Sequence, residues 1–288
     1  MEPSALLSRW LSNRLSKDAG EWLDGQRAKL SEGYTDRTLH ITLGLVPRRL
    51  GKDDLAPGEA ELTAAREARA HWDPHLWSVA DAARVLVLLE TAEHGNQPFP
   101  DRFVDLCRTS DVAELIAYYR GLPLYPEPEA LEPQAGEGLR TNMASVFEAV
   151  AHRNPYPRER FSEARWNQMV LKALFVGSRL DPIQGLDERA NPELAQIMCD
   201  YAHERWSAGR AVAPELWRCV GPFASDGMVD DLARAYASEV PAEALAGGLA
   251  LMACPDARAP GILGSRPDLE ERLRAGGIDW HAIAEMSR

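Results

Sequence analysis

The sequence predicts an all-α protein, and three observations lead to that class. Apolar residues recur three and four positions apart in many segments, which is the period of a helix with one buried face. No segment shows the alternation of strands and helices that a βαβ unit requires, or a run of strands. Cap-forming residues stand at several expected helix starts, and glycine or proline follows several expected helix ends. We therefore expect one all-helical domain, residues 1–288, of about ten helices packed as a bundle or an irregular, repeat-like α-solenoid.

The N-terminal part contains six expected helices. Periodicity predicts them at 6–15, 21–30, 37–46, 62–70, 79–94 and 111–120. The segment 37–46 also alternates as a strand does, and we favour the helix because no partner strand is visible. Ser78 followed by Asp81 three residues later forms a capping box before the helix at 79–94. Residues 96–100 are expected to end that helix, and Asp111 to cap the next one.

Residues 123–138 are rich in proline and glutamate and are predicted to form a surface loop. This loop separates an N-terminal half from a C-terminal half that carries a central stretch, residues 138–223. Further helices are expected at 141–151, 163–176, 192–206, 228–238, 242–252, 267–275 and 279–286, with a loop at 254–264. Asn191 followed by Pro192 is a strong start signal for the helix at 192–206.

Composition excludes several classes of function. With 45% hydrophobic and 26% charged residues, the 288-residue chain is typical of globular proteins that bury a sizeable core. Its net charge of −12 disfavours nucleic-acid binding. No apolar run reaches the ~18 residues of a membrane span, and the N-terminus lacks the pattern of a secretory leader, so we expect a cytoplasmic protein. The four cysteines are far apart, which argues against a disulfide framework or a structural zinc site.

The central stretch is where function is most expected. Its helices carry many polar residues where a core would be, and a buried polar group without a partner costs about 1–3 kcal/mol. Such residues therefore either pair internally or line a pocket, and both alternatives stay open. The candidate pocket residues are Asn142, Glu148, His152, Asn167, Gln168, Lys172, Asp187, Glu188, Arg189, Asp200, His203 and Glu204.

Two spacings among these residues suggest chemistry. Glu148 and His152 are four residues apart and share a helix face with Ser145, while Asp200 and His203 are three apart. Either pair has the groups for acid–base catalysis or metal binding. The first pair lacks the Glu-x-x-His spacing of di-iron helices and the second occurs only once, so we expect no metal ion and no cofactor. A Gly-rich phosphate loop, a nucleophile elbow and an HExxH motif are all missing from the sequence.

Several long segments resemble the EboA family. They are VPRRLGKDDL, WDPHLWSVADAARV, YYRGLPLYPEPEAL, EGLRTNMASVFEAVAHRNPYP, WNQMVLKALFVGS, GLDERANPELA and DYAHERWSAGRAVAPELWRCVGPF. The resemblance runs from about residue 10 to residue 223, with a weaker tail. It implies a setting in secondary metabolism, since such proteins are encoded beside prenyltransferase-like, sugar-phosphate-cyclase-like and hydrolase- or isomerase-like proteins. That cluster is linked to making or exporting a small molecule. The family offers no established catalytic residues to carry over.

Two functions follow as hypotheses. The first is an accessory or scaffold protein of a small-molecule pathway, whose partners are other proteins of that pathway or an intermediate. The alternative is an enzyme that uses the central residues on a cyclitol-like or prenylated substrate. In that case His152 or His203 is the base, and Lys172 and Arg189 hold an anion. The sequence leaves open whether the protein is an enzyme.

Overall fold

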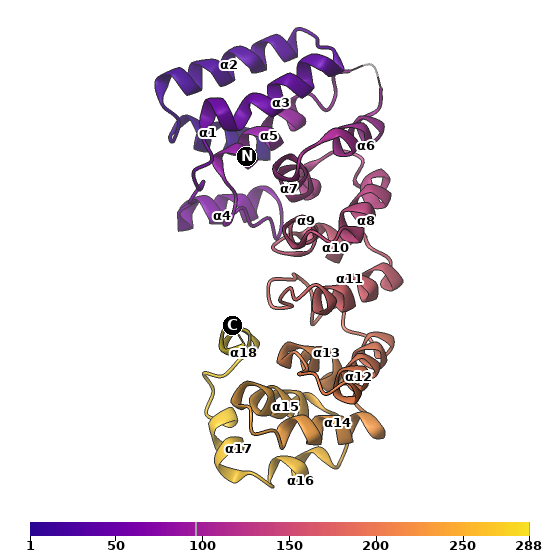
Figure 1. Ribbon diagram of the computed structural model, residues 1–288. Coiled ribbons are helices and arrows are strands. Elements are labelled where there is room, and N and C mark those ends of the chain that lie inside the picture. Colours follow the sequence, from indigo (N-terminus) through magenta and orange to yellow (C-terminus); the bar gives the residue numbers. More distant parts are fainter. Residues whose placement is uncertain (96, 288) are drawn as a thin grey trace. The chain divides into compact units, whose positions relative to one another are not determined.

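Regular structure in this computed structural model, which describes residues 1–95 and 97–287, is helical (Figure 1). Over these residues there are 18 α-helices, four short 3-10 helices and no strand, with one isolated bridge between Asp54 and Ser78. The all-α class is therefore confirmed. The helices outnumber the expected ten or so because many span fewer than three turns, too few for their period to stand out.

The chain divides into two compact units, Met1–Phe161 (unit 1) and Ser162–Arg288 (unit 2), which are described separately below. The single-domain arrangement stays a prediction. The helices of unit 1 are α1 (Pro3–Ser12), α2 (Lys17–Ser31), α3 (Asp36–Leu50), α4 (Glu59–Ala68), α5 (Val79–Glu90), α6 (Phe99–Thr109), α7 (Val112–Arg120), η1 (Leu122–Leu124), η2 (Pro128–Leu131), α8 (Glu132–Arg140), α9 (Ala144–Ala151) and α10 (Pro155–Arg160).

Three helices, α5, α7 and α9, follow one another as a stack through unit 1, with α5 packed on α7 and α7 packed on α9 (Figure 1). Each also packs against an earlier helix: α5 on α3, α7 on α6 and α9 on α8. The N-terminal ten residues of α5 are all buried, as its apolar sequence predicts. This stacking of helix pairs is the solenoid-like alternative of the prediction.

Cap residues explain where several helices begin. Ser78, Asp111 and Asn191 accept hydrogen bonds from backbone N–H groups in the first turns of α5, α7 and α12 (Pro192–Ser207), at 3.0, 2.8 and 2.8 Å. These starts confirm the expected caps. Helix α5 ends at Glu90 rather than at 94. After it, the buried Arg102 guanidinium donates hydrogen bonds to the backbone carbonyls of residues 91, 92 and 94. Asn96, the first residue of the expected break, lies outside the described residues.

Residues 123–138 are more ordered than the loop expected there. They form the end of η1, then η2 and most of α8. Leu131 and Ala135 are buried in this segment, and Gly138 lies so close to Tyr119 and Val150 that a side chain would clash with them. The prolines at 128 and 133 stand at the first two positions of these helices, where a missing N–H does no harm.

Unit 2 contains the remaining helices. They are α11 (Glu163–Phe175), α12 (Pro192–Ser207), η3 (Pro214–Leu216), α13 (Trp217–Val220), η4 (Gly221–Phe223), α14 (Gly227–Tyr236), α15 (Pro241–Ala253), α16 (Ala259–Leu263), α17 (Pro267–Arg274) and α18 (Trp280–Met286). The small α16 lies inside the segment expected to be loop, and its five residues are too few to show a period. Helix α15 is the hub, since α13, α14, α16, α17 and α18 all pack on it.

The sequence of α15 suits this role because it is built from small residues. Gly247 allows α14 and α15 to approach closely: a Cβ at this position would lie 2.5 Å from the backbone nitrogen of Tyr236 and 2.9 Å from the carbonyl carbon of Ala235. No side chain fits that space without separating the two helices.

Candidate functional site

A cleft of about 120 Å³ in unit 1 brings together several functional groups. Its walls are residues 73–77 before α5, the C-terminal half of α7, one face of α9 and the chain that follows α9. We call it the unit 1 cleft. Its lining residues are Asp73, Leu76, Trp77, Ile116, Arg120, Ser145, Glu148, Ala149, His152, Arg153 and Asn154.

Helix α9 has two faces, and one of them lines the cleft. Val146, Phe147 and Val150 are buried in the core of unit 1. Glu148 and His152, which the sequence predicts to share a face, lie together in the cleft with Ser145. Ser145 and Glu148 lie on successive turns of α9, and His152 directly follows the helix with an extended backbone. Met143, the residue before the helix, is 43% exposed and does not join this core.

Both acidic and basic side chains line the cleft. Arg153 Nη1 lies 2.6 Å from a carboxylate oxygen of Asp73, which joins the chain after α9 to the segment before α5. Arg120 Nη1 likewise lies 2.6 Å from a carboxylate oxygen of Asp81, whose side chain is 8% exposed and also closes the α5 capping box. Both arginines therefore stand beside an acceptor while still lining the cleft.

Asn154 fixes the junction between α9 and α10. It is buried, its amide nitrogen donates to the carbonyls of Tyr119 and Ala149 at 3.0 and 3.1 Å, and its amide oxygen accepts from the N–H of Tyr156. A side-chain amide is well suited to this position because it donates and accepts at once. The junction in turn sets the position of Arg153.

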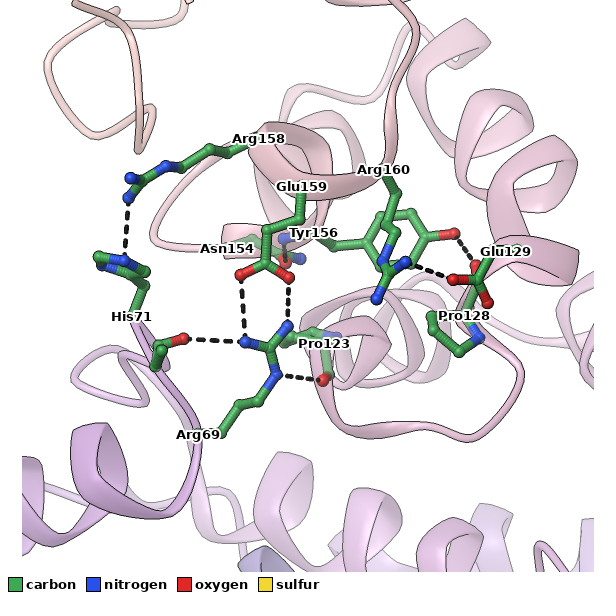
Figure 2. Close-up of polar contacts among 11 residues, drawn as sticks. Arg69, His71, Pro123, Pro128, Glu129, Asn154, Tyr156, Arg158, Glu159 and Arg160 are labelled. Atoms are coloured by element: carbon green, nitrogen blue, oxygen red, sulfur yellow. Dashed lines mark hydrogen bonds and ion pairs between the residues drawn. The ribbon is translucent and has the colours of Figure 1, made fainter. Parts of the chain in front are cut away.

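An arginine-rich border, shown in Figure 2, ties residues 69–71 to α10. Arg69 forms a two-pronged ion pair with Glu159 and donates to the carbonyl of Pro123 at 3.1 Å. Arg158 Nη1 lies 3.1 Å from the ring Nε2 of His71. Two-pronged pairs between arginine and carboxylate are geometrically restrictive, so these contacts fix residues 69–71 against α10.

Two residues next to these contacts have left-handed backbones. His71 has φ +62° and Arg153 has φ +49°, values that a residue with a side chain adopts at a cost. Backbone strain of this kind clusters at functional sites. Sequence reasoning missed Asp73, Arg120 and Arg153, because their importance comes from contacts between segments 39 and 80 residues apart.

Unit 2 holds the predicted pocket residues other than Asn142, Glu148 and His152, and most of them have partners of their own. Asp187 makes two hydrogen bonds with Arg218, at 2.6 and 2.7 Å. Burial alone would lower the pKa of Arg218, but the hydrogen bond and charge of Asp187 raise it overall. His203 Nε2 lies 2.8 Å from Asp231 on α14.

Asn167 and Arg189 come together at the start of α12. The amides of Asn167 and Asn191 form a mutual pair, at 2.9 and 3.3 Å, and Asn191 also donates to the carbonyl of Arg189. The Arg189 guanidinium lies 4.7 Å from the centre of the Trp166 ring, and burial lowers its pKa. This cluster is a structural link between α11 and α12.

The remaining predicted residues are half-buried or exposed. Burial lowers the pKa of Lys172, which is half-buried on α11. Asp200 accepts from Gln196 at 2.8 Å on the outer face of α12. The exposed members of the predicted set are Asn142, Gln168, Asp187, Glu188, Asp200, His203 and Glu204. Over residues 1–95 and 97–287, no three His, Cys, Asp or Glu side chains gather as a metal ion would require.

Comparison with known proteins identifies the family. A profile described as "Metabolite traffic protein EboA" matches residues 3–221, which is most of the chain and includes the whole unit 1 cleft. The chain belongs to the EboA family. No curated protein and no solved structure matches it. Within the described residues of this EboA-family protein, every helix is too short or too polar to cross a lipid bilayer.

Proposed function

We propose that this EboA-family protein is a non-catalytic accessory protein of a small-molecule pathway, which holds a polar intermediate in the unit 1 cleft. The family description names metabolite traffic, and a protein with that role has to bind its cargo reversibly. Holding the cargo requires a shaped and charged surface, and it does not require a nucleophile or a cofactor.

The observation that carries this proposal is that hydrogen-bond donors and acceptors line the same cleft. Arg120 and Arg153 present N–H groups, Asp73 and Glu148 present carboxylate oxygens, and Trp77 supplies an apolar wall. A compound with several hydroxyl groups donates to carboxylates and accepts from guanidinium groups, so it satisfies both kinds of group at once. A cyclitol-like intermediate has this chemistry.

The size of the cleft suits one part of a small molecule rather than the whole of it. Small-molecule sites that enclose their ligands usually measure about 300–1,000 Å³. At about 120 Å³, the cleft accommodates one polar ring or head group and leaves the rest of a larger intermediate outside. A downstream protein is then able to take the cargo from its exposed end.

Native mass spectrometry tests this proposal. The purified protein is equilibrated with the small-molecule fraction of its source organism, and the bound mass is compared among variants. We expect a stoichiometric extra mass on the wild type that is lost in Asp73→Asn and Glu148→Gln. The matched control is Glu137→Gln, which removes an exposed carboxylate on α8 from a local pair with Arg140. Retention of the mass by both cleft variants overturns the proposal.

Acid–base catalysis is a second candidate, favoured by the placement of Glu148 and His152 in one cleft. Catalysis and cargo holding differ in whether the mass of the bound compound changes with time. An enzyme converts the bound compound to a second mass over time, and His152→Gln then abolishes conversion while the first compound still binds. A bound mass that stays constant over hours excludes this candidate for that compound.

A further inference from the structure

A second cavity lies entirely within unit 2 and is larger, about 490 Å³. It is formed by the C-terminal end of α11 with residues 177–179, the end of α12, residues 211–215 and the inner face of α18. Most of its wall is apolar, including Leu174, Val212, Pro214 and Ala284. Its volume falls in the range of sites that hold small molecules.

Arg205 gives this cavity a positive charge. Its Nε donates to the carbonyl of Ala211 at 2.9 Å, which orients the guanidinium. Throughout residues 1–95 and 97–287, no carboxylate forms an ion pair with Arg205. A guanidinium fixed at one nitrogen, on the wall of an apolar cavity, retains donors for an anionic group.

The other charged groups of the cavity are engaged elsewhere. Arg179 pairs with Glu285 on α18 at 3.0 Å. Glu215 is buried and accepts from the backbone N–H of Asp181 at 2.6 Å, and burial raises the pKa of its carboxyl group. The Glu215 carboxylate is therefore hydrogen-bonded to the backbone at Asp181, whereas the Arg205 guanidinium keeps N–H groups for a ligand.

One wall comes from beyond the part of the chain that the family profile matches. Ala284 and Ser287 of the α18 region line the cavity, and the match ends at residue 221. Helix α18 is held over the cavity by Arg179–Glu285 and by His281 Nδ1, 2.9 Å from Asp181. The C-terminal segment thus completes a pocket whose other walls lie inside the family match.

We infer that this cavity is a binding site for a small organic anion with an apolar body, whose acidic group contacts Arg205 and whose hydrocarbon part lies against Leu174, Val212 and Ala284. The site shares no residue with the unit 1 cleft, so it goes beyond the function proposed above. Its ligand class is an amphipathic acid, such as a carboxylate or phosphate monoester of a short hydrocarbon.

Isothermal titration calorimetry with decanoate tests the inference on the full chain, with decanol as the uncharged analogue of the same length. We expect decanoate to bind the wild type and to bind Arg205→Gln roughly tenfold or more weakly, because a charge-assisted contact is lost. Arg210→Gln is the matched control, since Arg210 is exposed and five residues away. Arg205→Lys keeps the charge and is expected to lose less affinity than Arg205→Gln.

Hydrogen exchange locates the bound molecule. Decanoate should slow amide exchange at 177–179, at 211–215 and in α18, and it should leave exchange in α9 unchanged. The inference is overturned if decanoate does not bind, if decanol binds equally well, or if Arg205→Gln and Arg210→Gln behave alike. Protection confined to segments outside the cavity overturns it as well.

Discussion

Arg153 lines the unit 1 cleft and has a left-handed backbone, with φ +49°. The free-energy cost of this backbone conformation can be measured. Two substitutions isolate it, Arg153→Gly and Arg153→Ala, because both remove the same ion pair with Asp73. That pair is partly exposed, 41% for Arg153 and 25% for Asp73, so its loss costs only about 0–1 kcal/mol in either variant. The two variants therefore differ mainly in backbone conformation.

The expected difference follows from two opposing effects. Alanine in the left-handed region carries a steric cost of about 1–2 kcal/mol that glycine avoids. Glycine in turn loses about 0.5–1 kcal/mol through the greater freedom of its unfolded chain. We therefore expect Arg153→Gly to have a free energy of unfolding about 0.5–1 kcal/mol higher than Arg153→Ala. For a unit of this size that corresponds to about 1–4 °C in Tm.

The assay is thermal and urea unfolding of both variants, followed by circular dichroism. Arg66 inside α4 is the matched control, because it is exposed and helical. There the order should reverse, with Arg66→Gly about 1 kcal/mol less stable than Arg66→Ala. Equal stability of the two Arg153 variants, or a more stable alanine variant, refutes the reasoning. Both Arg153 variants should also lose the cargo mass, because both lack the guanidinium that lines the cleft.

Three further predictions concern unit 2 and the thiols. Gly247→Ala should lower the free energy of unfolding by about 1–3 kcal/mol, because the added methyl group forces α14 away from α15. Gly261→Ala is the control, since its Cβ would lie in open space, and it should have no such effect. Equal unfolding midpoints of the two variants would contradict the prediction. The hydrogen bond that the His281 ring donates to the Asp181 carboxylate, and then the charge of that carboxylate, raise the pKa of His281 above its ordinary value of 6.5. The stability that His281 contributes is thus fully present below pH 6.5 and is lost as pH rises through the folded pKa. His281→Gln should therefore lower Tm at pH 6 and not at pH 9. A difference in Tm that does not change with pH would refute this prediction. Burial raises the pKa of Cys107, Cys199 and Cys219 to about 12. In native protein at pH 8, iodoacetamide should therefore label the less buried Cys254 before any other thiol, which peptide mass mapping measures.

Much of the candidate site was visible in the sequence only as local pattern. The spacing of Ser145, Glu148 and His152 predicts one helix face. Ser145 and Glu148 lie on α9, His152 follows its last residue with an extended backbone, and all three line the unit 1 cleft. The same reasoning grouped Asp187 and His203 with them, although each has a partner of its own in unit 2, Arg218 and Asp231. Whether the full predicted set forms one pocket stays a prediction.

The sequence by itself determined the helical class, the long helices and their caps, since helical period and capping act over a few neighbouring residues. Only the tertiary structure decided that Asp73 meets Arg153, that Arg205 faces an apolar cavity, and that residues 123–138 form helices around buried Leu131. These features depend on burial and on contacts between segments far apart in the chain. The periodicity of one segment carries no information about which distant side chain completes its site.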